Sequence, residues 1–279
     1  MLREIQQQPE QRLRIDRSII SRIERLPDPT ADLELHDKSG GVGQVTARVS
    51  ELPTMPDSQP AESIPASQVD ALTEDHQSLE ELRTAVLSCK KCAHLVAFRH
   101  TVVFGVGNPR AELMFVGEAP GAEEDIQGEP FVGRAGELLT KIIQTMGYQR
   151  GEVYIANVLK CRPDLPPGAS GNRQPTLTEM QTCLPYLRQQ IEMIRPKVMV
   201  ALGGIAMRGL FGTAEPMKQL RGRWHAFNSI PVMATFHPSY LLRNQALSEK
   251  RKVWEDMLQV LERLGRPISE KQRNYFLAR

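Results

Sequence analysis

The sequence lacks several features that mark specialised protein classes. It contains no run of about 18 apolar residues, the length that a membrane-spanning helix needs, and no apolar block near its first residue that could act as a secretory signal. Only four cysteines and 5% aromatic residues occur among its 279 residues, which excludes a disulfide-rich secreted scaffold. Hydrophobic residues nevertheless make up 41%, enough for a substantial core. We therefore expect a soluble, cytoplasmic protein that binds no membrane.

Net charge is also small, at +2, but the charge is unevenly distributed. Residues 26–76 hold ten acidic residues against two basic ones, together with six prolines. Such a segment buries too little apolar surface to offset the entropy lost on ordering, so 27–76 is predicted to be an acidic disordered linker. Residues 77–279 hold 27 basic and 19 acidic residues. This excess suits a polyanionic partner, but it also occurs in proteins that bind no nucleic acid.

Ahead of the linker, residues 1–26 predict a short amphipathic helix. Six arginines occur in the first 25 residues, and the apolar residues recur at helical spacing: Leu13, Ile19, Ile20, Ile23 and Leu26. Two interpretations stay open. The helix either packs on its own domain or frays, because short isolated helices are marginal in water, or it binds a protein partner.

The remainder of the chain alternates between two kinds of apolar pattern. Short runs rich in β-branched residues predict buried strands at 113–117, 153–158, 198–202 and 232–236. Helical patterns lie at 135–146, 178–194, 205–211 and 248–264. This alternation predicts an α/β fold of three αβα layers with a central four-stranded parallel sheet. We place the domain at residues 77–265, with a C-terminal tail at 266–279.

Polar residues and a glycine lie within a few positions of the ends of the predicted strands. They are Glu118, Asn157, Gly203 and His237. Ligands of parallel sheets bind outside the carboxyl ends of the strands, so these residues are expected to face one crevice.

The stretch "GEAPGAEED" at residues 117–125 places four carboxylates and two glycines after a buried strand. Gly117 and Gly121 let the backbone bend sharply and approach a ligand closely. The turn is therefore a candidate ligand site. In the alternative interpretation its carboxylates only cap the helix that begins near Ala135, since acidic residues are common at helix starts.

The four cysteines have a spacing typical of a metal site. Cys89 and Cys92 form a C-x-x-C pair, whereas Cys161 and Cys183 stand alone. Four thiolates can bind either zinc or an iron-sulfur cluster. A zinc ribbon normally has two close pairs, so the split second pair suits a cluster held from several loops at least as well. Buried free thiols are the remaining alternative.

Three motifs occur in a fixed order with these cysteines interleaved: "GEAPGAEEDIQGEPFVGRAGELL", "IANVLKCRP" and "TFHPSYLLR". In combination they resemble the family 4 uracil-DNA glycosylases over residues 82–264. The resemblance implies a hydrolase that cuts the N-glycosidic bond of uracil in single- or double-stranded DNA. It leaves an abasic site and so initiates base excision repair. It also implies a [4Fe-4S] cluster on the four cysteines, and we expect a monomer.

The resemblance implies two catalytic residues. His237 matches the histidine that donates a hydrogen bond to uracil O2, where negative charge develops as the bond breaks. Glu118 matches the acid that positions water beside the sugar and faces its cationic charge, which requires an ionised carboxylate. A histidine that is merely hydrogen-bonded at a strand end would occupy the same sequence position.

Five further residues match positions that bind the base. Asn157 matches the asparagine that reads uracil O4 and the ring N–H together, a pattern that cytosine reverses. Phe131 would stack on the flipped ring, although a core phenylalanine is the alternative. Glu124 corresponds to the wall that excludes the methyl group of thymine. Gly117 and Ala119 would allow close backbone approach to the base and to the attacking water.

The last motif carries the expected contacts to DNA. Ser239 would bond a phosphate, Leu241 or Leu242 would wedge into the gap left by the base, and Arg243 would hold the backbone. A helix start with two core leucines is the alternative. Basic residues near the motifs are further candidates for phosphate contacts: Lys160, Arg162, Arg221 and Arg223.

Two other functions fit parts of the pattern. One is a non-catalytic nucleic-acid-binding module with a structural four-cysteine zinc site. The other is a covalent uracil-DNA trapping relative, in which glutamine replaces the alanine after the acid of the first motif and a basic loop ends in a nucleophilic histidine. Ala119 and the absence of a convincing insertion favour turnover, while His225, which follows two nearby arginines, is the position to check.

Overall fold

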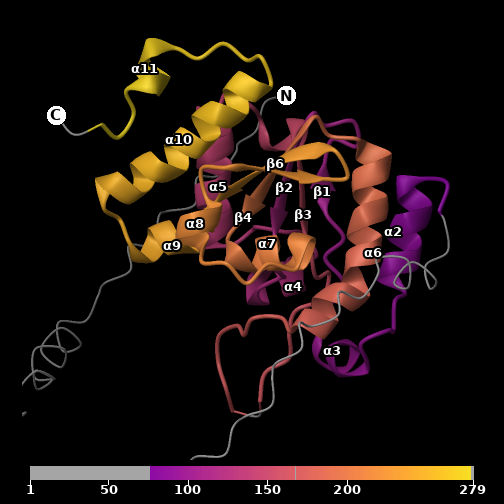
Figure 1. The fold of residues 1–279 in the computed structure, drawn as a ribbon. Helices are drawn as coiled ribbons and strands as arrows, with labels where there is room; N and C mark the ends of the chain where they lie inside the picture. Colours follow the sequence, from indigo (N-terminus) through magenta and orange to yellow (C-terminus); the bar gives the residue numbers. More distant parts are fainter. Residues whose placement is uncertain (1–75, 167, 278–279) are drawn as a thin grey trace, which may run out of the picture. The chain divides into compact units, whose positions relative to one another are not determined.

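Six strands form one mixed sheet in the computed structural model, which describes residues 76–166 and 168–277 (Figure 1). Its four inner strands are parallel, in the order β3, β2, β4, β6. Their bounds are Leu113–Gly117 for β2, Tyr154–Asn157 for β3, Val198–Leu202 for β4 and Ile230–Thr235 for β6. Buried central strands of parallel sheets have near-continuous apolar sequences. The predicted four-stranded parallel sheet is confirmed.

Two edge strands are additions to the predicted sheet. β1 (Val106–Gly107) pairs antiparallel with β3, and β5 (Trp224–Phe227) pairs antiparallel with β6. β5 and β6 are joined by Asn228 and Ser229, both of which have positive φ. Two such residues form the hairpin turn whose twist matches that of paired strands. The short β1 and a turn without glycine explain why the sequence pattern missed both strands.

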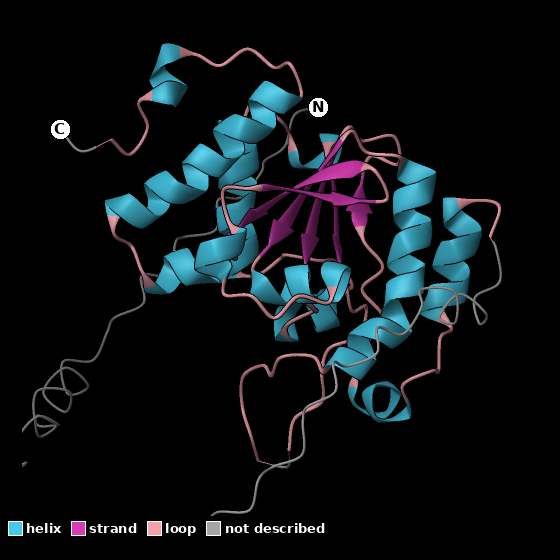
Figure 2. Ribbon diagram, in the orientation of Figure 1, coloured by secondary structure: helices cyan, strands magenta, loops and turns pink. Residues whose placement is uncertain are grey.

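Helices cover both faces of the sheet, as Figure 2 shows. On one face, α6 (Leu177–Ile194) and α7 (Gly204–Phe211) pack on the strands. On the other face, α5 (Arg134–Thr145) and α10 (Leu247–Arg263) do the same. Each of the four begins and ends within one residue of its predicted bounds. The three-layer αβα prediction is therefore confirmed.

Apart from the helix start that the alternative for the last motif named, at residues 238–243, the short helices at loops escaped the sequence analysis, because fewer than three turns give little periodicity. They are α2 (Leu79–Leu87), α3 (Ala93–Phe98), α4 (Ala122–Gln127), η3 (Arg150–Glu152), α8 (Met217–Leu220), α9 (Pro238–Arg243) and α11 (Glu270–Arg273). Among the residues that the structure describes, no helix is long and apolar enough to cross a membrane.

The described part of the predicted tail, residues 266–277, contains α11 and contacts α10. The indole N–H of Trp254 donates to the carbonyl oxygen of Gln272 over 2.6 Å, and the Tyr275 ring packs edge-on against the Trp254 ring. The predicted amphipathic helix at 1–26 and all but the last residue of the linker at 27–76 lie outside the described residues. The domain limits of 77 and 265 stay predictions.

Candidate active site

The carboxyl ends of the parallel strands surround a hollow of about 500 Å³. Glu118 follows β2, Asn157 ends β3, and His237 lies two residues beyond β6. The structure brings these three predicted residues together in the lining. The other lining residues are Ala119, Pro120, Gly121, Glu124, Phe131, Ala135, Asn172, Arg173, Gln174, Gly203, Gly204, Ile205, Ser239 and Arg243.

Gly117 makes room for two of these side chains. A Cβ atom at this position would lie 2.3 Å from Asn157 Oδ1 and 2.6 Å from the Phe131 ring. Phe131 itself has a φ of 54°, in a region that costs a non-glycine residue of order 1 kcal/mol or more. Its ring lies 5.6 Å from the His237 ring, centroid to centroid. The close approach at Gly117 thus sets an aromatic ring beside a carboxamide and an imidazole.

The Asn157 carboxamide is buried and aimed at the hollow. Its residue is 2% exposed, and Oδ1 has no hydrogen-bond partner among the described residues. An unsatisfied buried acceptor costs about 1–3 kcal/mol. A ligand with an N–H group would remove that cost, so the orphaned oxygen marks a recognition site.

His237 has a defined tautomer. Its Nδ1 accepts a hydrogen bond from the backbone N–H of Ser239 over 3.1 Å, and Ser239 Oγ lies 2.8 Å away. Burial lowers the pKa of His237 to about 4, and the charge of Arg243 adds to this shift. The imidazole is therefore neutral at pH 7, with its proton on Nε2. Since a Cβ at Gly203 would lie 3.0 Å from the His237 Cβ, this glycine gives the histidine its space.

Glu118 is half-buried, and this burial raises the pKa of its carboxyl group to about 7. A carboxyl group with such a pKa exchanges protons near neutrality, as a general base or a water-positioning group requires. Glu118 and His237 are thus pushed in opposite directions from their ordinary pKa values, a pattern common at functional sites.

The acidic turn has a structural role as well as a place in the lining. Glu124 Oε2 accepts from the N–H of Gly121 over 3.0 Å, and Oε1 accepts from Val132 and Gly133 over 3.2 and 3.4 Å. Glu124 completes the capping box of α4, and its bond to Gly133, the N-cap residue of α5, also ties it to the start of the later helix that the alternative interpretation named. Capping and ligand approach are therefore not exclusive here.

Asp125, which the sequence analysis did not single out, anchors this turn. It is fully buried and accepts from the backbone N–H groups of His100 and Thr101, while His100 Nδ1 lies 2.8 Å from its Oδ2. Its acidic neighbours in the sequence gave no sign that this carboxylate points inward.

The residues of α9 separate into two groups. Ser239 and Arg243 line the hollow, as predicted. Leu241 is 5% exposed and packs with Phe236 and Val253, so it is a core residue as the alternative held. Leu242 is partly exposed, and the wedge role stays a prediction for that leucine alone.

Three of the four basic candidates for phosphate contacts are already engaged within the protein. Lys160 is 1% exposed, and its Nζ donates to the carbonyl oxygen of Asn157 and to Gln190. Arg221 forms an ion pair with the buried Asp256 over 2.5 Å. The predictions for Lys160 and Arg221 are therefore wrong.

Arg162 donates to the carbonyl oxygen of Gly171 over 2.9 Å. Arg223 is exposed, and a phosphate contact by its side chain stays a prediction. His225, the position to check for covalent trapping, lies on β5 with Nε2 3.0 Å from the carbonyl oxygen of Leu220 and is not part of the lining.

The four cysteines lie together beside α2 and α6. Cys161 and Cys183 are buried in an apolar cluster, and Cys89 and Cys92 pack against it. Arg99 Nη1 donates to Cys161 Sγ over 2.8 Å, and the Lys160 backbone N–H lies 3.3 Å from Cys183 Sγ.

The electrostatics of these thiols suit a metal-bound state. Burial raises the pKa of the Cys183 thiol to about 12, with Lys160 opposing the shift and Cys161 adding to it. The pKa of Cys92 is also raised, by burial and then by Cys161 and Cys89. Burial and neighbouring thiols hinder the ionisation of Cys92, Cys161 and Cys183, and N–H donors are aimed at two of the sulfurs. Metal binding would stabilise the thiolate forms of such a donor set. The residues therefore fit a thiolate-bound centre.

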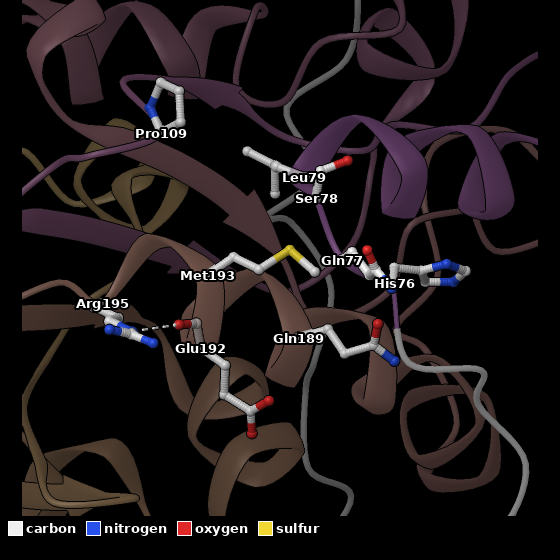
Figure 3. A pocket seen from close by; sticks show the side chains of 9 residues that line it. All are labelled: His76, Gln77, Ser78, Leu79, Pro109, Gln189, Glu192, Met193 and Arg195. Carbon is white, nitrogen blue, oxygen red and sulfur yellow. Dashed lines mark hydrogen bonds between the residues drawn. The ribbon is translucent and has the colours of Figure 1, made fainter.

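A second hollow of about 500 Å³ lies between the start of α2 and the end of α6, and its lining includes Gln77, Gln189 and Met193 (Figure 3). Of its charged groups, Arg195 donates from Nε to the carbonyl oxygen of Glu192 over 3.2 Å. It contains none of the predicted catalytic residues. The hollow at the strand ends is therefore the candidate active site.

Sequence reasoning missed one part of that site. Asn172, Arg173 and Gln174 line the hollow although they lie in the long loop between β3 and α6, remote from any strand end. No periodicity identifies a loop of this kind, and its position directly after the Cys161 motif is the one sequence signal that could have placed it near the crevice.

Comparison with known proteins agrees with this geometry. Residues 104–258 match the family model of the uracil DNA glycosylase superfamily. The chain is 40% identical to a type-4 uracil-DNA glycosylase of Sulfurisphaera tokodaii, over 72% of this chain and 90% of that one. It is 43% identical to a type-4 uracil-DNA glycosylase of Thermotoga maritima, over 64% and 91%. A type-5 uracil-DNA glycosylase of Pyrobaculum aerophilum is 27% identical, over 64% and 88%. The chain therefore belongs to the uracil-DNA glycosylase superfamily and, within it, to the type-4 uracil-DNA glycosylases.

Proposed function

We propose that this protein hydrolyses the N-glycosidic bond of uracil in DNA, leaving an abasic site and initiating base excision repair. The observation that carries the proposal is the orphaned Oδ1 of Asn157, buried in a hollow that also holds a neutral histidine and a carboxyl group. An extruded pyrimidine offers the hydrogen-bonding groups that this site lacks.

Asn157 is proposed to select the base. Its Oδ1 would accept the ring N–H of uracil while its amide N–H₂ donates to O4, and cytosine would place a lone pair and an amino group there instead. Sites built on such bonds reject the wrong partner strongly, since their own groups are then left unpaired. Phe131 would stack on the base, and Glu124, held rigidly by backbone N–H groups, would exclude a methyl group at C5.

His237 is proposed to stabilise the departing uracil. With Nδ1 occupied by the N–H of Ser239, the Nε2 proton is free to donate to O2, where negative charge develops. A neutral donor gains strength as this charge grows, so it binds the transition state better than the ground state. The low pKa of His237 keeps it in that neutral form at physiological pH.

Glu118 is proposed to hold the attacking water and to face the cationic sugar. Both tasks need the ionised carboxylate. The backbone of Ala119 would lie beside the same water. Since the pKa of Glu118 is about 7, a substantial fraction is ionised at neutral pH, and the cationic charge on the sugar favours that form further.

DNA is the proposed macromolecular partner, either as a single strand or as a duplex from which the nucleotide is flipped. Ser239 and Arg243 at the rim of the hollow would contact phosphates, and Leu242 would fill the gap left by the base. Monomeric action, and a protein partner for the N-terminal extension, remain predictions.

Cys89, Cys92, Cys161 and Cys183 are proposed to hold a [4Fe-4S] cluster. Four thiolates drawn from separate loops are a usual ligand set for such clusters. When bound, the cluster would supply a covalent tie between those loops. Arg99 and the Lys160 backbone N–H would donate to the ligand sulfurs, as they do to the thiols.

The test is an assay of the purified full-length protein on matched oligonucleotides that contain uracil, thymine or cytosine at one position. We expect release of uracil alone, by a brown protein that needs no added metal. A matched variant is Asn157→Asp, which preserves shape but replaces the amide donor, and it should lose most uracil release while staying folded. A colourless, zinc-loaded protein that releases no base would instead indicate a binding module.

A further inference from the structure

A smaller, apolar hollow lies between α5, α9, α10 and the residues that follow α11, and we call it the tail pocket. Its lining includes Leu138 and Ile142 of α5, Leu241 and Leu242 of α9, Trp254 of α10, and Phe276. Its volume is about 190 Å³. This is less than the roughly 300–1,000 Å³ of pockets that enclose a whole drug-sized ligand, so it suits a single small group. The proposed function uses Leu242 of this lining and no other part of it.

The tail pocket has a buried apolar floor and partly exposed apolar walls. Leu241, Val253 and Trp254 are buried at its floor. Leu138 and Ile142, from successive turns of α5, are half-exposed and form one wall. Apolar side chains that stay open to solvent around a hollow are a common mark of a binding site.

Phe276 stands at the rim of the tail pocket. It is 39% exposed, although a phenylalanine side chain is largely apolar. Its φ of 61° lies in the left-handed region, which residues other than glycine rarely adopt. Such a conformation persists only where the surrounding structure fixes it. The ring therefore has a defined place at the opening of the pocket.

The surroundings that fix Phe276 belong to α10, because the chain doubles back along this helix after α11 (Figure 1). Arg251 Nη1 donates to the carbonyl oxygens of Arg273 and Tyr275 over 2.7 and 2.9 Å. The Tyr275 ring also packs edge-on against the Trp254 ring, with 5.5 Å between the centroids. The aromatic ring at the rim is thus carried on a rigid support.

The tail pocket adjoins the candidate active site along two helices. On α5, Ala135 lines the hollow at the strand ends and Leu138 lines the tail pocket. Three residues of a helix span about 4.5 Å, which is close to the rise of roughly 3.4 Å for one nucleotide in a stacked strand. On α9, the neighbours Arg243 and Leu242 line the two hollows in the same way. A strand whose uracil enters the first hollow therefore has a neighbouring base within reach of the second.

The charge at the rim also suits a strand of DNA. Of the described residues in the lining, Lys250 alone is charged, and it forms no ion pair within the described part of the chain. A nucleotide offers a phosphate to such a cation and a flat base to the apolar walls. Proteins that bind single strands combine positive charge with aromatic side chains in this way.

We infer that the tail pocket is a second DNA-binding site, which takes a nucleobase next to the uracil in the same strand, and that Phe276 stacks on this base. The inference rests on the proposed uracil excision, which brings the strand to α9. Stacking tolerates any sequence, because every base has a flat π-face, so the site takes all four bases. A base bound there anchors the strand on one side of the extruded nucleotide.

The first test compares Phe276→Ala with the full-length wild type on a single-stranded oligonucleotide that contains one uracil. Phe276→Ala should raise KM at least about fivefold, the lower end of what one stacked base contributes. The value of kcat should stay within about twofold, because the contact is the same in the ground state and the transition state.

Two further substitutions separate stacking from simple filling of space. Phe276→Trp keeps a flat ring and should recover most of the lost affinity, whereas Phe276→Leu keeps only apolar bulk and should not. Leu277→Ala changes the next residue, which is exposed and lies outside the lining, and this matched control should behave as the wild type does. Full recovery of KM in Phe276→Leu would overturn the stacking role.

The second test asks whether Phe276 acts on a base. In a series of strands, each nucleotide near the uracil is replaced in turn by a stable abasic sugar. For the wild type, KM should rise at least about fivefold on the strand that lacks the bound base. On that strand Phe276→Ala and the wild type should have the same KM, since the contact is already missing.

The outcomes separate the inference from the proposed function. An active wild type with the same KM on every strand overturns the inference, and so does a loss in Phe276→Ala that persists undiminished on all of them. A wild type that releases no uracil overturns the proposed function itself.

Discussion

The hollow at the strand ends and the four-cysteine region are built in opposite ways. Glu118, Asn157 and His237 each come within two residues of a buried parallel strand, so the sheet itself fixes their backbone positions. Cys89, Cys92 and Cys161 come from turns and loops, and Cys183 comes from the second turn of α6. A sheet needs no further tie to hold three side chains together. Loops need such a tie to keep their side chains together, and a bound cluster would supply it.

The two regions share pieces of chain. Asn157 and Cys161 are four residues apart, and Lys160 between them donates to the Asn157 carbonyl oxygen while its backbone N–H faces Cys183. A second link runs through residues 99 and 100: Arg99 donates to Cys161 Sγ, and the next residue, His100, contacts Asp125 of the acidic turn. Damage to the cysteine region should therefore reach the hollow, whereas damage within the hollow should stay local.

The largest effect is expected from Cys161→Ser, which removes a buried thiol that we propose as a cluster ligand. We expect loss of the broad absorbance near 400 nm, of soluble yield and of uracil release together, because one missing thiolate frees the loop after β3. Iron content, absorbance and thermal unfolding would measure it. A variant that stays stable and active would show that the cluster, if present, does not hold the fold.

His237→Ala should lose activity while keeping its absorbance and its fold. Removal of one preorganised donor to a developing anion costs roughly 100- to 1000-fold in rate, while the exchange at the edge of the hollow leaves the core intact. Single-turnover uracil release, absorbance and the melting temperature should show a slow but brown and folded protein. Near-normal turnover would refute the donor role, and a loss of colour would refute the separation of the two regions.

The difference in construction also explains what the sequence could predict. Strands 113–117 and 198–202 were predicted to the residue, because buried parallel strands are unbroken apolar runs, and the residues after them were correctly placed around one crevice. The burial of Lys160, Leu241 and Asp125 and the ion pair that engages Arg221 could not be predicted in this way, since charge and short spacing do not reveal which side of a loop or a one-turn helix faces the core.

The part of the lining that comes from the loop between β3 and α6 was missed for a related reason. Asn172 and Arg173 reach the hollow only because ion pairs to Asp164 and Glu179 fold the loop back. Such contacts depend on the tertiary structure and leave no periodic trace in the sequence. The identity of the cluster and the roles of the site residues came from the family resemblance. The strand pattern alone indicated only a crevice, and the cysteine spacing alone indicated only a metal site.

The pH dependence should test the hollow alone. As the pKa of Glu118 is about 7, kcat/KM should fall about tenfold per pH unit below that value and level off above it, while His237 stays neutral down to about pH 4. In Glu118→Gln the slope should vanish and leave a low, flat rate. A wild-type profile that is flat from pH 5 to 8 would exclude an essential ionised Glu118.

The same pKa makes a prediction about stability. A carboxyl group whose pKa rises from 4.5 to about 7 on folding stabilises the protein below pH 4.5, and that contribution is lost as the pH rises through about 7. Glu118→Gln should therefore be more stable than the wild type at pH 8, by at most about 3 kcal/mol. The difference should be smallest near pH 4, which urea unfolding at the two pH values would measure.

The smallest effect is expected where the two regions meet, at the clamp between His100 and Asp125. His100→Ala removes one of the donors to the buried carboxylate but leaves the two backbone N–H groups in place, and the ring is largely exposed. We expect a loss of about 1 kcal/mol or less in unfolding free energy and a reduction of uracil release of no more than a few-fold. In Asp125→Asn the new amide N–H₂ group would face the N–H donors of His100 and Thr101, so this variant should lose more unfolding free energy than His100→Ala. If both variants lose iron and activity in proportion, the acidic turn and the cysteine region act as one unit; if activity falls while iron stays bound, the clamp serves the hollow alone.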